Sequence, residues 1–141
     1  CGGRGTGAVS QTLSVEGSKL VAVADAFPDK AKAVVDNIKG RFKEKVDVPD
    51  ARVFAGWDAY KKAIEFANMV ILTTPPGFRP EMFEYAVSKG KHVFMEKPVA
   101  TDPSGIRRVI AAAKEADAKK LKVVCGLQRR YQKRPCDVGR I

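Results

Sequence analysis

The chain has 141 residues, of which 45% are hydrophobic and 30% charged, and it contains 12 glycines and 8 prolines. This composition is typical of one globular domain and excludes a disordered, collagen-like or coiled-coil chain. No apolar run approaches the roughly 18 residues of a membrane span, and the first residues do not resemble a signal peptide, so we expect no membrane partner. The single histidine, His92, and three scattered cysteines, Cys1, Cys125 and Cys136, predict no metal site and a reducing, cytoplasmic location.

The formal net charge of +10 makes nucleic acid a partner to consider. Much of the excess lies late in the chain, at Lys119, Lys120, Lys122, Arg129, Arg130, Lys133, Arg134 and Arg140. No helix-turn-helix or RNA-binding motif accompanies these residues. We therefore expect no nucleic-acid partner, and interpret the basic cluster as an exposed interface beside an anion site.

Short apolar runs alternate with amphipathic segments along the whole chain. The apolar runs predict strands at residues 20–25, 52–55, 69–73, 92–95 and 121–125. Helices are expected from Thr6 to near Gly17, from Pro28 to Gly40, after a cap at Asp58, from Pro80 to Gly90, and after Asp102-Pro103. Residues 126–141 show no clear period. This order predicts an α/β fold with a doubly wound parallel sheet and helices on both faces.

Some side chains are expected to be structural. We expect His92 to be structural because it begins a strand, and Cys125 to be a small buried core residue. The remaining candidates for the core or for helix–sheet packing are Met69, Met95, Phe66, Phe83 and Phe94.

The glycines that open the chain are typical of a loop that approaches a pyrophosphate. Side chains there would keep the phosphates away from backbone N–H groups at a helix N-terminus. Two registers of G-x-G-x-x-G are possible. In the preferred one, Gly2 and Gly5 are the second and third glycines; in the other, Gly3, Gly5 and Ala8 form the G-x-G-x-x-A variant. Either register predicts a cofactor-binding loop at Gly2, Gly3, Arg4 and Gly5.

An acid follows the glycines at the expected distance. Asp25 ends a predicted strand 20 residues after Gly5, close to the spacing of the carboxylate that binds the adenosine ribose. Its negative charge would repel a 2′-phosphate, so NAD is favoured over NADP, although nearby Lys30 keeps NADP open.

Three later segments carry a family resemblance. They are Thr73-Thr74-Pro75-Pro76, the run from Gly90 to Pro98 (GKHVFMEKP), and Gly126 to Tyr131 (GLQRRY). With these motifs the chain resembles the Gfo/Idh/MocA oxidoreductases, which act on sugars and related alcohols. The Glu-Lys-Pro motif after a G-K-H-V strand is quite specific to that family. The similarity covers residues 1–132, which we therefore expect to form an NAD(P)-binding Rossmann domain. Residues 133–141 are expected to be a divergent basic tail.

The resemblance implies hydride transfer between a nicotinamide cofactor and a sugar or cyclitol hydroxyl. It implies that Lys97 is catalytic and contacts the substrate hydroxyl, where an ammonium group would stabilise developing alkoxide charge. As in relatives, the bond before Pro98 would be cis. The cofactor-binding residues implied after the glycine loop and Asp25 are Thr74, Pro75, Pro76, Glu96, Lys97, Gln128 and Arg129. Glu96 would pair with Lys97 or with cofactor groups.

Two departures from the family matter. Its opening strand, central in the Rossmann order, is absent, which leaves residues 20–25 and 69–73 without a shared neighbour. We expect either residues before Cys1 or another segment to fill this place, with Val138–Ile141 as one candidate. The family's C-terminal α/β domain is also absent; it supplies most of the substrate pocket, the usual acid/base residue and the oligomer interface. Turnover by the chain alone is therefore not expected, and a homo-oligomer is expected only for a full-length protein.

The same motifs leave other functions open. An NAD-dependent glycosidase of the same superfamily would share them, because it oxidises and re-reduces its sugar. A non-catalytic nucleotide-binding module is the third alternative.

Overall fold

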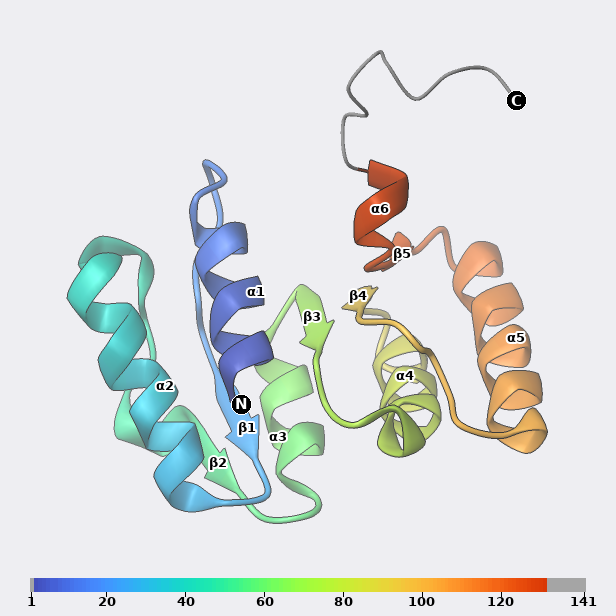
Figure 1. Ribbon diagram of the computed structural model, residues 1–141, viewed down its shortest axis with the longest axis horizontal. Coiled ribbons are helices and arrows are strands. Elements are labelled where there is room, and N and C mark those ends of the chain that lie inside the picture. Colours follow the sequence, from blue (N-terminus) through green and yellow to red (C-terminus); the bar gives the residue numbers. More distant parts are fainter. Residues whose placement is uncertain (1, 132–141) are drawn as a thin grey trace.

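The computed structural model describes residues 2–131, which alternate between helices and strands (Figure 1). The strands are β1 (Val23–Asp25), β2 (Val53–Ala55), β3 (Met69–Leu72), β4 (His92–Met95) and β5 (Val123–Cys125). The α-helices are α1 (Gly3–Leu13), α2 (Pro28–Arg41), α3 (Ala59–Phe66), α4 (Arg79–Ser88), α5 (Pro103–Ala118) and α6 (Gln128–Tyr131). Three short 3₁₀ turns connect them, η1 (Lys43–Lys45), η2 (Asp50–Arg52) and η3 (Pro76–Phe78). Among the described residues no helix is long and apolar enough to cross a membrane.

All strand pairs are parallel, as the alternating pattern predicts. Strand β1 pairs with β2, with Val23 opposite Val53, and forms one small sheet. A second sheet has the order β3-β4-β5, with Met69 opposite His92 and Val93 opposite Val123. Because parallel strands need a crossover between them, each pair is connected through a helix, and the α/β Rossmann-type class is confirmed.

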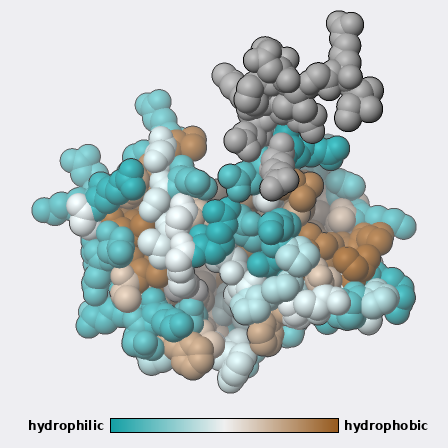
Figure 2. All heavy atoms as spheres, viewed as in Figure 1, coloured by the Kyte–Doolittle hydropathy of each residue, from teal (hydrophilic) through white to brown (hydrophobic). Residues whose placement is uncertain are grey.

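Helices cover the strands from two sides. Apolar side chains of α2, including Ala31 and Val35, pack with Val23 and form one core. A larger core gathers α3, α4 and α5 against the second sheet, with Phe83 and Val87 fully buried against Val93. Figure 2 shows apolar side chains gathered on the outer side of α5, at the right of the view, where Ile106 and Ile110 are exposed.

The boundaries of several elements differ from the predictions. Helix α1 begins at Gly3 and ends at Leu13, earlier at both ends than the expected run from Thr6 to near Gly17. Asp102 caps α5 as predicted, because its Oδ1 accepts a hydrogen bond of 2.8 Å from the Gly105 N–H. Asp58 occupies the N-cap position of α3 but makes no capping bond, because its carboxylate pairs with Lys61 at 2.6 Å instead. The short helix α6 lies where the sequence shows no period, since four residues are too few to display one.

Only some of the residues that the sequence analysis assigned to the core or to helix–sheet packing are buried. Met95 and Phe83 are buried as predicted. Phe66 and Met69 are 51% and 46% exposed, so neither belongs to the core, although Phe66 does make the helix–sheet contact that was the other expectation. Phe66 ends α3 and stacks on Phe54, while alternation along β3 turns Met69 away from the face that buries Val70 and Leu72. Cys125 is only partly buried.

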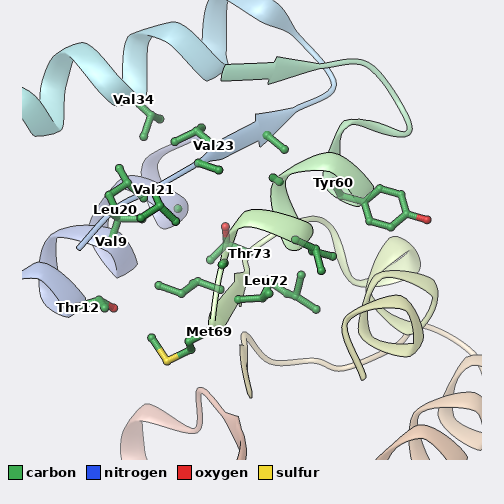
Figure 3. Close-up of a pocket in the computed structure, with 18 of the residues that line it drawn as sticks. Val9, Thr12, Leu20, Val21, Val23, Val34, Tyr60, Met69, Leu72 and Thr73 are labelled. Atoms are coloured by element: carbon green, nitrogen blue, oxygen red, sulfur yellow. The ribbon is translucent and has the colours of Figure 1, made fainter. Parts of the chain in front are cut away.

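The two sheets are separated by an apolar slot. Within residues 2–131 no strand pairs with the facing edges of β1 and β3, as expected from the missing neighbour. A cavity of about 190 Å³ lies between them, and Figure 3 shows Val9, Val21 and Val23 on one side of it and Leu72 and Thr73 on the other. Residues 138–141, one candidate for filling this place, lie outside the described residues.

Candidate functional site

The sequence-predicted residues gather at one edge of the two sheets. Asp25 is the last residue of β1, Thr74 follows β3, Glu96 follows β4 and Gly126 follows β5. The N-terminus of α1 meets the same edge, because Gly2 and Asp25 line one cavity (Figure 1). In open α/β sheets, ligands bind outside the carboxyl ends of the strands. The topology therefore assembles loops from both sheets into one candidate site.

The glycine loop presents backbone N–H groups to this edge. The first intrahelical bond of α1 runs from the Thr6 N–H to the Gly2 carbonyl oxygen at 3.0 Å, so the amides of Gly3, Arg4 and Gly5 precede it. Gly2 has φ of +105°, a conformation that favours glycine. A side chain there would be strained, and these donors suit an anion.

Close packing of α1 also favours a glycine. A Cβ on buried Gly5 would lie 3.0 Å from the side-chain oxygen of Thr73, directly after β3, so an alanine there would require the Thr73 hydroxyl to move. Close helix–strand packing is the task of the third glycine in the G-x-G-x-x-G motif. Together with the helix start at Gly3, this geometry favours the register in which Gly2 and Gly5 are the second and third glycines.

Asp25 lies at the end of β1, partly buried, with its backbone and side chain both held. Its Oδ1 accepts a hydrogen bond of 3.0 Å from the Phe27 N–H, and its carbonyl oxygen accepts one of 3.0 Å from the Gly56 N–H. Exposed Lys30 places its ammonium 5.7 Å from the centre of the Phe27 ring. The carboxylate and this lysine line a cavity of about 530 Å³, within the roughly 300–1,000 Å³ range of small-molecule pockets.

The turn after β3 also lines that cavity. Thr74 and exposed Pro75 line it, and Pro76 begins η3. The Thr74 hydroxyl contacts the Met82 sulfur on α4 at 3.4 Å, which ties the turn to the helix below it. Thr74 and Pro75 thus face the same space as Asp25, although they follow a different sheet.

In the Glu-Lys-Pro segment after β4, the acid Glu96 is buried and the base Lys97 is exposed. Glu96 is only 5% exposed, and its Oε1 pairs with the Arg4 guanidinium from the first turn of α1. The sequence hypothesis named Lys97 or cofactor groups as partners of Glu96, and it did not foresee the ion pair with Arg4. Lys97 is exposed at the carboxyl edge, and the bond between Lys97 and Pro98 is cis, as implied by the resemblance.

Gly126 allows the Glu96 carboxylate to lie where it does. A Cβ on buried Gly126 would lie 2.8 Å from Glu96 Oε1. The Gly126 N–H donates to the Met95 carbonyl oxygen at 2.8 Å, which brings the chain after β5 against the chain after β4. The glycine is therefore needed for close approach.

A buried arginine supports this segment, and the sequence analysis did not identify it. Arg79, the first residue of α4, donates through Nη1 to the carbonyl oxygens of Glu96, at 2.6 Å, and of Pro98. Burial lowers the pKa of its guanidinium, and the Glu96 carboxylate opposes this shift. Arg79 holds the backbone on both sides of Lys97. The sequence offered only one signal, an arginine directly before the expected helix start at Pro80.

Two further candidates lie apart from these contacts. Gln128 is exposed and begins α6, outside the residues that line the cavity beside Asp25. Arg129 follows it in the helix, but its side chain lies outside the described part of the structure. Two aromatic residues that the sequence analysis did not assign, Trp57 and Phe78, do line that cavity.

Comparison with known proteins agrees with this geometry. Residues 3–124 match the model of an oxidoreductase family, Gfo/Idh/MocA, described by its NAD-binding Rossmann fold. An inositol 2-dehydrogenase/D-chiro-inositol 3-dehydrogenase of Halalkalibacterium halodurans is 32% identical over 92% of this chain and 35% of its own length. A glycosyl hydrolase family 109 protein of Bacteroides thetaiotaomicron is 33% identical over 77% of this chain and 23% of its own.

A solved structure shares the fold. The scyllo-inositol dehydrogenase of Lactobacillus casei with bound NAD(H) and scyllo-inositol matches with a TM-score of 0.68 and 23% identity, over 94% of this chain and 36% of that one. The chain thus spans only 23% to 36% of the length of these three relatives.

Proposed function

Because the chain belongs to the Gfo/Idh/MocA oxidoreductase family, we propose that it binds NAD at the carboxyl edge of its sheets and serves hydride transfer at a sugar or cyclitol hydroxyl. One observation carries the proposal: Gly2 of the glycine loop, Asp25 and the Thr74-Pro75 turn, from separate parts of the chain, line the same cavity. Residues 1–132 form the cofactor-binding domain in this proposal, and residues 133–141 a tail.

Each part of the edge has a proposed task. The N–H groups of Gly3, Arg4 and Gly5 at the start of α1 hold the pyrophosphate, with Gly2 giving the turn. The Asp25 carboxylate accepts hydrogen bonds from the adenosine ribose, and Thr74, Pro75 and Pro76 border the path of the cofactor. Glu96, Lys97, Gln128 and Arg129 are proposed to lie at the nicotinamide end.

Lys97 is the proposed catalytic residue. Bound NAD would supply the hydride acceptor. The exposed Lys97 ammonium, at the end of β4, would donate a hydrogen bond to the reacting hydroxyl oxygen and stabilise the negative charge that develops on it. Arg79 would keep this lysine in place through the carbonyl groups on both sides of it.

NAD binding is the first test. Calorimetric titration of the 141-residue chain, after circular dichroism has verified its fold, is expected to show binding of NAD and weaker binding of NADP. Removing the acid with Asp25→Ala should weaken NAD binding about 10- to 100-fold, as expected for loss of hydrogen bonds to a charged group. The same substitution should reduce the preference for NAD over NADP. The control Asp50→Ala, an exposed acid in η2, should change neither. A folded chain that binds no NAD would contradict the proposal.

Hydride transfer is the second test. We propose that the chain alone gives no turnover, because the relatives it matches are about three times as long. Formation of NADH from NAD and myo-inositol by these 141 residues would contradict this. In a longer protein that joins the chain to a substrate domain, Lys97→Ala should abolish NADH formation while NAD still binds.

A glycosidase is the second candidate, because a glycosyl hydrolase family 109 protein is as similar in sequence as the inositol dehydrogenase. In the same longer protein, release of free sugar from a nitrophenyl glycoside without net NADH would favour the glycosidase. NADH formation from a free cyclitol would favour the dehydrogenase.

A further inference from the structure

Two exposed aromatic rings stand at the mouth of the cavity beside Asp25. Trp57 is 73% exposed and Phe78 is 45% exposed, and their ring centroids lie 5.7 Å apart with planes tilted by 42°. We propose that Trp57 and Phe78 form an aromatic platform on which the adenine ring of the cofactor stacks. This inference rests on the proposed NAD site and assigns residues to its adenine end.

The platform joins the two sheets. Trp57 follows β2, which pairs with β1, whereas Phe78 lies in η3, which follows β3. The pair therefore spans the slot between the sheets at their carboxyl edge. Both residues line the same cavity as Asp25, Thr74 and Pro75.

The position selects the adenine end of a dinucleotide. Adenine is attached to the ribose that Asp25 is proposed to bind, so the ring must lie in or beside this cavity. Glu96 and Lys97, proposed for the nicotinamide end, do not line it.

The chemistry of the rings suits a flat heterocycle. A base stacks on an aromatic face without needing a specific hydrogen-bond pattern, and such contacts are worth about 1–3 kcal/mol for each base. Because both rings are exposed to water in the free chain, a stacked base would remove part of their apolar surface from water. Asp25 would then recognise the ribose, and Trp57 with Phe78 the base.

Trp57 reports directly on this contact because it is the chain's single tryptophan. Titration with NAD or ADP-ribose should quench its fluorescence. For each ligand, the dissociation constant from fluorescence should equal the one from calorimetry. Nicotinamide mononucleotide, which lacks adenine, should leave the fluorescence unchanged.

Substitutions separate stacking from a structural effect. Trp57→Ala and Phe78→Ala should each weaken the binding of ADP-ribose about 5- to 50-fold, measured by calorimetry. Trp57→Phe, which keeps an aromatic ring, should retain most of the affinity. The matched control Phe66→Ala removes another half-exposed ring, one that does not line the cavity, and should leave affinity unchanged. Circular dichroism verifies that each variant is folded.

The outcomes distinguish the platform from the site itself. If calorimetry detects no NAD binding by the folded chain, the proposed function fails and the platform fails with it. If NAD binds while Trp57 fluorescence stays constant and Trp57→Ala binds equally well, the platform alone is wrong.

Discussion

The guanidinium of Arg79 donates a hydrogen bond of 2.6 Å to the main-chain carbonyl oxygen of Glu96. A second bond from the same nitrogen reaches the Pro98 carbonyl oxygen, so one buried side chain holds both sides of Lys97. A buried carbonyl that loses its donor keeps the cost of desolvation, which makes this arginine important for stability and for the position of the proposed catalytic lysine.

Replacing Arg79 should therefore unfold the chain more easily. We expect Arg79→Met to lower the free energy of unfolding by about 3 kcal/mol, because two carbonyl groups lose a charged donor. Urea denaturation measures the change. Arg108→Met is the matched control, since Arg108 pairs with Glu84 at the exposed surface and should contribute less than about 1 kcal/mol. Equal stability of the two variants would contradict this role for Arg79.

Much of the fold follows from local sequence pattern. The run from His92 to Met95 is apolar and bounded by Gly90 and Pro98, so β4 was predicted with its observed limits. Asp102 before Pro103 likewise predicted the start of α5. Helix α6 could not be predicted, because its four residues complete only about one turn.

The contacts within the candidate site depend on tertiary structure. Glycine spacing and Asp25 identify the loops at the carboxyl edge, but the pair between Arg4 and Glu96 joins residues 92 positions apart. No local pattern specifies that contact. Trp57 and Phe78 were missed for the same reason, because each is an ordinary loop aromatic until the two sheets bring them together.

Gly126 provides a second test of the packing around Glu96. In Gly126→Ala the new methyl group would lie 2.8 Å from Glu96 Oε1, so the carboxylate must move from its buried position beside Arg4. We expect a loss of about 1–3 kcal/mol in unfolding free energy, as for other overpacked sites. Gly40→Ala on α2, where an added methyl group meets nothing within 4 Å, should instead stabilise the chain by up to about 1 kcal/mol. Thermal unfolding of both variants gives the comparison, and a neutral effect of Gly126→Ala would show that Glu96 is not confined.

Cys125 should react slowly with alkylating reagents. Burial raises the pKa of its thiol, the Glu96 carboxylate raises it further, and the Arg79 charge and the Gly126 backbone oppose this only in part. Because the thiolate is the nucleophile, a raised pKa leaves less reactive thiol at neutral pH, and the reaction accelerates only at higher pH. The measurement is the rate of iodoacetamide labelling as a function of pH in a Cys1→Ser, Cys136→Ser background. The pH at the midpoint of this curve should be higher for the folded chain than for the urea-unfolded chain. Glu96→Gln removes the nearby negative charge and should lower the midpoint; an unchanged midpoint would contradict the effect of Glu96.

The slot between β1 and β3 should accept an added parallel strand. Among the described residues no strand pairs with the facing edges of β1 and β3, and the slot is lined by apolar side chains such as Val21, Val23 and Leu72. Gly2, at the start of α1, lines the cavity beside Asp25 at the carboxyl edge of the sheets, so a strand fused ahead of the chain would run parallel to β1 and enter α1 directly. We expect a fused segment of six valine and isoleucine residues to raise the unfolding free energy by at least about 3 kcal/mol, since each fully buried aliphatic side chain contributes about 1.5–3 kcal/mol. A fused segment of equal length made of glycine and serine is the control. Urea denaturation compares the two, and hydrogen exchange should show new protection at Val23 and Val70 only with the apolar segment. Equal stability of the two fusions would show that the slot does not bind a strand.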